Sequence, residues 1–119
     1  MQYRPLPLYQ KSLSAVGIGA MSFSDFYGAV TAKQAFAILD HAVAAGINHI
    51  DTSNVYGSGQ SERLIGEYMR QHQLPRDTFF IATKAGIGRK PGSTERTFIN
   101  DPEYLRAELE KSLERLGVD

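Results

Sequence analysis

Residues 45–69, AGINHIDTSNVYGSGQSERLIGEYM, contain one complete change from strand to loop to helix. The apolar stretch 47–51 ends at Asp51 and predicts a short strand, and the Gly and Ser residues after it predict a loop. From about Ser61 a helix is predicted, because apolar residues return at helical spacing. These apolar residues are Leu64, Ile65, Tyr68 and Met69. The stretch therefore predicts one βα unit.

A similar unit precedes this one. Residues 13–19 (LSAVGIG) predict a strand, after an edge or turn segment that the prolines of residues 5–9 indicate. A polar, aromatic loop at 20–30 leads to Thr31 and Gln34, whose spacing fits a capping box. The apolar positions of the helix that follows are Ala35, Ile38, Leu39, Ala42 and Val43, and Gly46 is expected to end it.

A third unit follows. Residues 79–84 (FFIATK) predict a strand, and 85–100 predict a long loop rich in Gly, Pro and Arg. Asp101 and Pro102 predict an N-cap followed by Pro at the first helical position. The helix is marked by Leu105, Leu109, Leu113 and Leu116, and Gly117 ends it. Residues 118–119 are expected to begin a fourth strand.

The predicted strand ends, near residues 19, 51 and 84, recur about every 30 residues, which is typical of βα units that build a parallel sheet. A parallel sheet needs cover on both faces. Two closures satisfy this requirement, an open doubly wound sheet or a (β/α)8 barrel. A barrel takes about 250 residues. We therefore predict an α/β fold and expect the 119-residue chain to be a fragment of one domain.

Composition excludes several classes of function. Thirteen basic and thirteen acidic residues give zero formal net charge, which disfavours nucleic-acid binding. The absence of cysteine excludes disulfides, thiolate chemistry and cysteine-based zinc sites. No apolar stretch reaches the roughly 20 residues that span a bilayer, and the N-terminus lacks the apolar core of a signal peptide. We expect a cytoplasmic protein with no membrane partner.

The histidines and the first glycine pair do not make sites by themselves. His49 and Asp51 share one side of a predicted strand, but two ligands are too few for a metal site, so no metal is predicted. Gly17 and Gly19 begin like a dinucleotide fingerprint, which needs a third Gly where Ser22 stands. A close approach of the backbone at a strand end is the simpler interpretation.

Asp51, Tyr56 and Lys84 are the candidate reactive residues. Asp51 and Lys84 end consecutive predicted strands, and ligands of parallel α/β proteins bind at these carboxyl ends. Pairing the two charges offsets part of their desolvation cost. A nearby ammonium also stabilises phenolate and makes a tyrosine a better proton donor. Gly57 and Gly59 leave the loop free to approach a ligand. Both a catalytic trio and a structural cluster are open interpretations.

Three segments carry a family resemblance. GIGAMSFSDFYG, AGINHIDTSNVYGSGQSERLIGEYM and FFIATKAGI, in this order and spacing, resemble the aldo-keto reductase family. Within it, they look like the bacterial branch that also resembles potassium-channel β subunits. The DT-x-x-x-YG-x-G-x-SE block, followed by TK, is the most specific part. The resemblance implies a (β/α)8 barrel, with residues 1–119 as its incomplete N-terminal part, covering about the first three βα units.

The resemblance also implies a function and a set of site residues. The family reduces aldehydes or ketones with NADPH, without a Rossmann domain, through a catalytic tetrad of Asp, Tyr, Lys and His. Asp51, Tyr56 and Lys84 match the first three members, and the His belongs to the end of the fourth strand. Tyr56 would protonate the carbonyl oxygen, Lys84 would tune Tyr56, and Asp51 would hold Lys84 and line the nicotinamide ribose site.

Further residues are implied around the cofactor and the substrate. The segment expected to line the nicotinamide side of the pocket is Gly19, Ala20 and Met21. The aromatic residues expected to wall the substrate pocket are Phe23, Phe26 and Tyr27. Asn54 occupies a loop position where the family often has an acidic residue, or the position next to it. We expect Asn54 to influence substrate preference more than the chemical step.

Two other functions compete with the enzyme. The first is a regulatory subunit that binds NADP(H) to sense redox state with little turnover, because such proteins carry the same trio. The second is a truncated product that is unstable and inactive, because three βα units expose sheet edges and apolar helix faces.

Overall fold

The computed structural model describes residues 1–89 and 95–119, and its centre is a parallel sheet of three strands in the order β3-β4-β5. These strands are β3 (Ile18–Gly19), β4 (His49–Asp51) and β5 (Phe80–Ala82). The α-helices are α1 (Ala32–Ala44), α2 (Gln60–Gln71) and α3 (Pro102–Leu116). Strands and helices thus alternate along the chain, as the sequence predicts.

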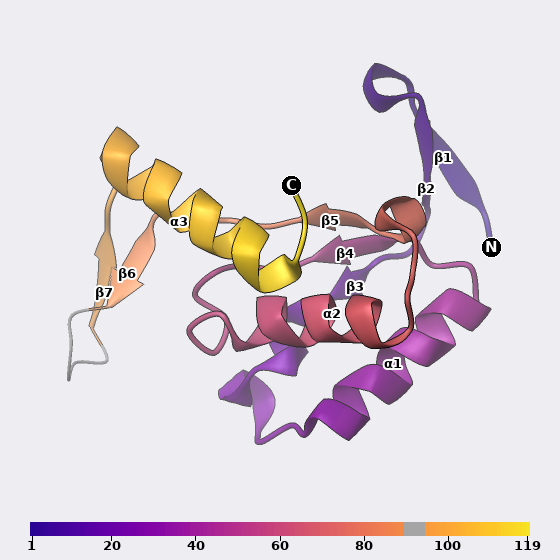
Figure 1. Ribbon diagram of the computed structural model, residues 1–119, viewed down its shortest axis with the longest axis horizontal. Coiled ribbons are helices and arrows are strands. Elements are labelled where there is room, and N and C mark those ends of the chain that lie inside the picture. The colour runs from indigo at the N-terminus through magenta and orange to yellow at the C-terminus, as the bar shows by residue number, and fades with distance from the viewer. Residues whose placement is uncertain (90–94) are drawn as a thin grey trace.

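The helices follow one another in space in the same order as the strands. Helix α2 packs between α1 and α3, and the view in Figure 1 shows the three around the sheet. A doubly wound sheet would place some of its helices on the opposite face, whereas a barrel keeps consecutive helices adjacent on its outside. The arrangement therefore belongs to the barrel class.

The predicted helix signals are confirmed at both ends. Thr31 Oγ1 accepts from Gln34 N, and Gln34 Oε1 accepts from Thr31 N, which completes the capping box of α1. Asp101 caps α3 with its side chain, ahead of Pro102. Gly117 ends α3 in the left-handed conformation, at φ 67°. These local signals need no tertiary contact, which is why the sequence predicts them well.

The predicted first strand, 13–19, is divided between two sheets. β1 (Tyr3–Leu6) and β2 (Lys11–Ser14) form an antiparallel hairpin around the 3₁₀ turn Pro7–Tyr9. Only residues 18–19 join the parallel sheet. The strand ends at Ser14, where the backbone N–H donates to a side chain instead of a neighbouring strand. Ser14 N lies 2.7 Å from Asn48 Oδ1. The prediction of one continuous strand was wrong.

The predicted loop 85–100 contains a second hairpin. β6 (Ile87–Arg89) and β7 (Arg96–Phe98) pair antiparallel, with Ile87 opposite Phe98 and Gly88 opposite Thr97. The part of the predicted loop at 90–94 lies outside the described residues. Strands of three residues are too short to give a clear alternation of apolar and polar positions. The hairpin was therefore missed.

Short 3₁₀ turns connect the remaining elements. They span Ala20–Phe23, Asp25–Tyr27 and Arg76–Thr78. Residues 118–119, expected to begin a fourth strand, have no strand pairing, although Val118 packs against the core. In the part of the chain that the structure describes, no helix is long and apolar enough to cross a membrane.

The core lies between the inner faces of the first two helices and the parallel sheet. Its buried apolar residues are Ala20, Phe23, Ala35, Leu39, Ile50, Leu64, Ile65, Tyr68, Met69, Phe79 and Leu116. Helix α3 contributes only its last turn to this cluster, and Leu109 is 51% exposed. The third helix is thus attached mainly through its C-terminal end.

Gly66 allows that attachment, and it leads to a first prediction. A Cβ added at Gly66 would overlap Arg115 O and lie 2.7 Å from Leu116 O, so α2 and α3 cross almost backbone to backbone. We expect Gly66→Ala to lower the unfolding free energy by about 1–2 kcal/mol, although alanine favours helix. Urea denaturation measures the change. Gly19→Ala is the control because its Cβ meets nothing within 4 Å, and equal stability of both variants contradicts the prediction.

A second prediction concerns pH and the contact between α1 and α2. Tyr68 is 2% exposed and donates its hydroxyl to Asp40 Oδ1 at 2.9 Å. Burial, and then the bond and charge of Asp40, raise the pKa of Tyr68 to about 12. Because unfolded tyrosine titrates near pH 10, the stability from this group is complete below about pH 10 and is lost as pH rises toward 12.

The measurement is the unfolding free energy as a function of pH, compared with that of Tyr68→Phe. We expect the wild-type protein to lose stability more steeply than the variant above about pH 10. Parallel curves for the two proteins would show that the Tyr68 proton is not linked to folding.

Candidate active site

The candidate site lies at the carboxyl ends of the three parallel strands. Gly19 is the register partner of Asp51, and Asp51 is the partner of Ala82 on the other side. Lys84 follows two residues after Ala82, and Thr52 N donates to Ala82 O at 2.8 Å to extend the ladder. This end of a parallel sheet is where ligands bind in barrel proteins.

Asp51 and Lys84 form an ion pair at this end. Lys84 Nζ lies 2.6 Å from Asp51 Oδ1 and also donates to Thr52 O at 2.8 Å. The side chains are half exposed, at 48% for Lys84 and 51% for Asp51. An ion pair this exposed contributes little stability. Its main effect is to hold the ammonium in one place.

Tyr56 completes the group that the sequence singles out. Lys84 Nζ lies 5.2 Å from the centre of the Tyr56 ring, within the range of a cation–π contact. Lys84 uses two of the three N–H donors of an ammonium on Asp51 and Thr52. The structure thus brings Asp51, Tyr56 and Lys84 together, and one N–H of Lys84 is left for a further acceptor.

Two buried hydroxyls attach the Tyr56 loop to the neighbouring strand end. The oxygens of Thr52 Oγ1 and Ser61 Oγ are 2.8 Å apart, and Ser61 Oγ donates to Ala20 O at 2.8 Å. Thr52 and Ser61 are fully buried. The loop therefore begins and ends on a polar network that also holds the turn after β3.

Asn54 attaches the same loop to β5 and α3. Its N–H donates to Lys84 O at 3.1 Å, and its Nδ2 donates to Glu108 Oε2 at 2.8 Å. The pKa of Glu108 lies below its usual value, mainly because Lys111 donates a hydrogen bond to this carboxylate. Burial acts in the opposite direction, and the hydrogen bond from Asn54 lowers the pKa further. Asn54 is 7% exposed and is not among the residues that line the cavity beside Tyr56.

A fully buried carboxylate lies beneath the site. Glu62, 0% exposed, accepts from Arg115 Nη1 at 2.8 Å and from Thr83 Oγ1 at 2.6 Å. It therefore connects α2 to α3 and to the residue before Lys84. Glu62 could not be recognised from the sequence, because glutamate in the first turn of a helix is usually exposed.

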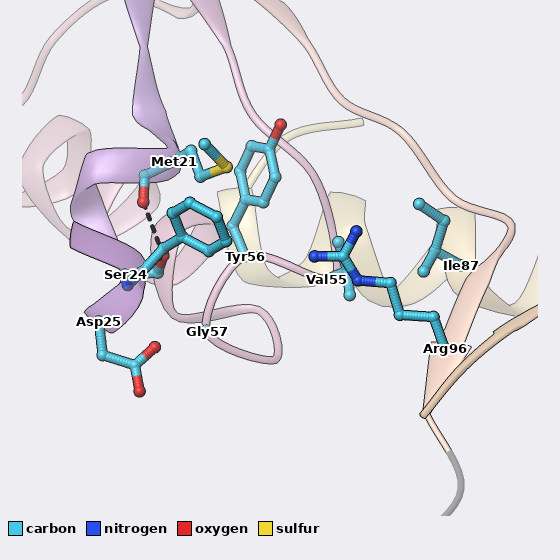
Figure 2. A pocket seen from close by; sticks show the side chains of 9 residues that line it. Met21, Ser24, Asp25, Val55, Tyr56, Gly57, Ile87 and Arg96 are labelled. Carbon is cyan, nitrogen blue, oxygen red and sulfur yellow. Dashed lines mark hydrogen bonds between the residues drawn. The ribbon is translucent and has the colours of Figure 1, made fainter. Parts of the chain in front are cut away.

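A cavity of about 280 Å³ opens beside Tyr56 (Figure 2). It lies between the turns after β3, the Tyr56 loop and the β6–β7 hairpin. Its lining residues are Met21, Ser24, Asp25, Phe26, Val55, Tyr56, Gly57, Ile87 and Arg96. Ile87 and Arg96 were not predicted as site residues from the sequence, because only the β6–β7 hairpin brings them to the cavity.

The predicted pocket aromatics divide into three environments. Phe26 lines the cavity, as expected, whereas Phe23 is fully buried in the core and does not wall the pocket. Tyr27 is 71% exposed and packs edge-on against Phe26, with ring centres 5.0 Å apart. The placement of Phe23 corrects the prediction. It lies in the 3₁₀ turn Ala20–Phe23, which turns this side chain inward.

The residues predicted at the nicotinamide side also differ in environment. Gly19 is exposed beside Asp51, Ala20 is fully buried, and Met21 lines the cavity. Ala20 is therefore covered by protein atoms, and its carbonyl oxygen already accepts a hydrogen bond from Ser61 Oγ. The carboxylate of Asp51 and the open space at Gly19 lie together at the strand ends.

The histidines stand apart from this site. His41 Nδ1 lies 2.7 Å from Ala37 O on α1, His72 stacks on Tyr68, and half-buried His49 packs against Phe80. Within residues 1–89 and 95–119, no three His, Asp or Glu side chains gather as metal ligands.

Comparison with protein families identifies related chains. The sequence profile of the Aldo/keto reductase family matches residues 15–119. An NADP(+) aldo-keto reductase of Schizosaccharomyces pombe is 35% identical over 108 residues, which cover 91% of this chain and 32% of that protein. An L-galactose dehydrogenase of Arabidopsis thaliana is 36% identical, over 90% of this chain and 32% of that protein.

Solved structures give the same result. The holo form of an aldo-keto reductase from Bacillus halodurans superposes with a TM-score of 0.83 and 27% identity, over 100% of this chain and 37% of that one. A glycerol dehydrogenase from Gluconobacter oxydans superposes with a TM-score of 0.80 and 28% identity. The match covers 98% of this chain and 36% of that one. The chain thus spans about a third of the length of the relatives it matches, and its three βα units correspond to part of their (β/α)8 barrels.

The buried Glu62 leads to a third prediction. Glu62→Ala leaves Arg115, whose side chain is 21% exposed, without its carboxylate, and Thr83 without its acceptor. We expect a loss of about 3–5 kcal/mol in unfolding free energy. Denaturant titration measures this loss. Glu67→Ala is the control, because Glu67 lies on the same helix and bonds only to exposed Gln71 among the contacts described. Similar losses for both variants contradict the role of Glu62.

Proposed function

This chain belongs to the aldo/keto reductase family, and from that premise we propose that it supplies the Asp–Tyr–Lys part of an active site that reduces aldehydes or ketones to alcohols with NADPH. The observation that carries the proposal is the position of Lys84 Nζ, 2.6 Å from Asp51 Oδ1 and 5.2 Å from the Tyr56 ring centre. We further propose that residues 1–119 are the N-terminal part of one barrel domain.

Tyr56 is the proton donor in this proposal. Its side chain lines the cavity, and in this proposal its hydroxyl meets the oxygen of a bound carbonyl group. The proton moves from Tyr56 Oη to that oxygen as the carbonyl carbon receives a hydride. The positive charge of Lys84 favours the phenolate that remains.

Lys84 and Asp51 hold the donor ready. Asp51 Oδ1 and Thr52 O hold Lys84 in place, with its ammonium 5.2 Å from the centre of the Tyr56 ring. Asp51 keeps the ammonium from turning into solvent. The arrangement needs no movement of charge before the reaction, which is how preorganised sites lower a barrier.

The residues at the strand ends fit a nicotinamide nucleotide. A Cβ at Gly19 would meet nothing within 4 Å, so there is open space beside the half-exposed carboxylate of Asp51. Asp51 would accept hydrogen bonds from ribose hydroxyls, and Met21 would pack beside the ring. The bound cofactor would supply the hydride. The names of the S. pombe relative, with NADP(+), and of the holo-form B. halodurans structure support this cofactor.

The family resemblance implies a fourth catalytic residue, a His, after the residues of this chain. His72 is the last histidine of the sequence and precedes Lys84, so it does not match that position. We propose that residues beyond this third of the barrel supply the His and most cofactor contacts. A regulatory subunit that binds NADP(H) with little turnover would have the same trio, and turnover separates the two functions.

The fourth prediction tests Tyr56 in the full-length protein. We expect Tyr56→Phe to lower kcat for aldehyde reduction by about 10²- to 10⁴-fold, because it removes the proton donor. NADPH affinity, measured by fluorescence titration, is expected to stay unchanged. Tyr27→Phe is the matched control, because it removes a hydroxyl from an exposed ring that does not line the cavity.

Near-normal turnover of Tyr56→Phe would refute the proton-donor role. If the wild-type protein binds NADPH tightly and oxidises it with none of a panel of aldehydes and ketones, the enzyme proposal fails. The regulatory function would then be favoured.

A further inference from the structure

Among the described residues, Arg96 is the cationic side chain that lines the cavity beside Tyr56, and the proposed reduction gives it no role. It comes from β7, whereas Tyr56 comes from the loop after β4. The two residues lie 40 positions apart in the sequence and line one cavity of about 280 Å³. Figure 2 shows the Arg96 side chain extended toward Val55 and Tyr56, with its guanidinium at the cavity.

The hairpin presents Arg96 to the cavity through its register. Ile87 lies opposite Phe98 in the pairing, and because alternate positions of paired strands share a face, Ile87, Arg96 and Phe98 lie on one face of the hairpin. Gly88 and Thr97 occupy the other face. Of the described side chains on this face, Ile87 and Arg96 line the cavity, so the face toward Tyr56 combines an apolar surface with a cation.

Among the described residues, no group neutralises the Arg96 cation. Within residues 1–89 and 95–119, the Arg96 guanidinium makes no hydrogen bond or ion pair. By contrast, the cations Lys84, Lys111 and Arg115 each pair with a carboxylate. Its five N–H donors are thus available to a ligand.

Among the described residues, Asp25 is the other charged residue that lines the cavity. Figure 2 shows Asp25 and Arg96 at opposite ends, with Tyr56 and Gly57 between them. An anion held by Arg96 would therefore be separated from the Asp25 carboxylate. The opposite charges also give a bound molecule a preferred direction in the cavity.

We propose that Arg96 binds an anionic group of the substrate, a carboxylate or a phosphate, and so selects carbonyl compounds that carry such a group. The proposal rests on the proposed function, because it places the carbonyl at Tyr56 and the anion at Arg96. A guanidinium binds carboxylate or phosphate through two parallel hydrogen bonds, which fixes orientation as well as charge. The small volume of the cavity suits a short molecule with both groups.

The fifth prediction compares matched substrates in the full-length protein with NADPH. 4-Oxobutanoate is paired with its neutral methyl ester, and glyceraldehyde 3-phosphate with glyceraldehyde. We expect Arg96→Met to lower kcat/KM about 10- to 100-fold for the anionic member of at least one pair, because a charge-assisted bond is lost. Each neutral member should change less than about 2-fold. The pair that responds distinguishes carboxylate from phosphate.

Two further variants sharpen the comparison. Arg96→Lys keeps the charge and loses the two-bond geometry, so it should restore part of the preference. Arg106→Met removes the same charge from an exposed position on α3 that lines no part of the cavity, and it should leave both members of each pair unchanged. Arg96 is itself exposed, so its replacement should not affect folding.

Calorimetric binding of the four compounds separates this proposal from the proposed function. If the protein reduces no carbonyl compound but Arg96→Met still loses binding of one anion, the reductase proposal fails and the anion site stands. Equal losses on anionic and neutral compounds, or unchanged binding and turnover of both anions, would overturn the proposal for Arg96.

Discussion

In the parallel sheet β3-β4-β5, backbone hydrogen bonds hold Asp51 between Gly19 and Ala82. This register decides the position of the ion pair, because Lys84 follows Ala82 and meets the carboxylate across one strand spacing. A slip of one residue would turn Asp51 toward the other face of the sheet. The open space at Gly19, the Asp51–Lys84 pair and the approach of Lys84 to Tyr56 all depend on this alignment.

The Tyr56 loop keeps its form through polar contacts beneath and beside it. Thr52 and Ser61 fasten its two ends, and Asn54 bonds it to Lys84 O and Glu108. A buried network of this kind is costly unless its polar atoms are paired. The hydroxyls of Thr52 and Ser61 are paired, whereas Asn54 Oδ1 is buried without a hydrogen-bond partner among the described residues. The site is therefore held by the packing of α2, α3 and the strand ends together. The exposed Asp51–Lys84 ion pair fixes the position of the Lys84 ammonium and contributes little to stability.

Local signals in the sequence predict the alternating helices and strands. They also predict the Asp51, Tyr56 and Lys84 group of the site. The capping box at Thr31, the N-cap at Asp101 and the spacing of strand ends predicted the helices and the parallel sheet. The hairpins escaped prediction, since pairing of very short strands depends on residues distant in the chain. Phe23 was placed in the wrong environment because a pattern of aromatics does not reveal which way a 3₁₀ turn faces.

By itself, the sequence determined the residue types of the trio and their places at strand ends, because backbone preference and apolar periodicity act over a few residues. Tertiary structure alone decided how close these residues come and what surrounds them. Glu62 is buried because Arg115 and Thr83 satisfy it, and Arg96 reaches Tyr56 because β6 and β7 pair. Contacts of this kind depend on chain segments far apart in sequence, and only packing brings those segments together.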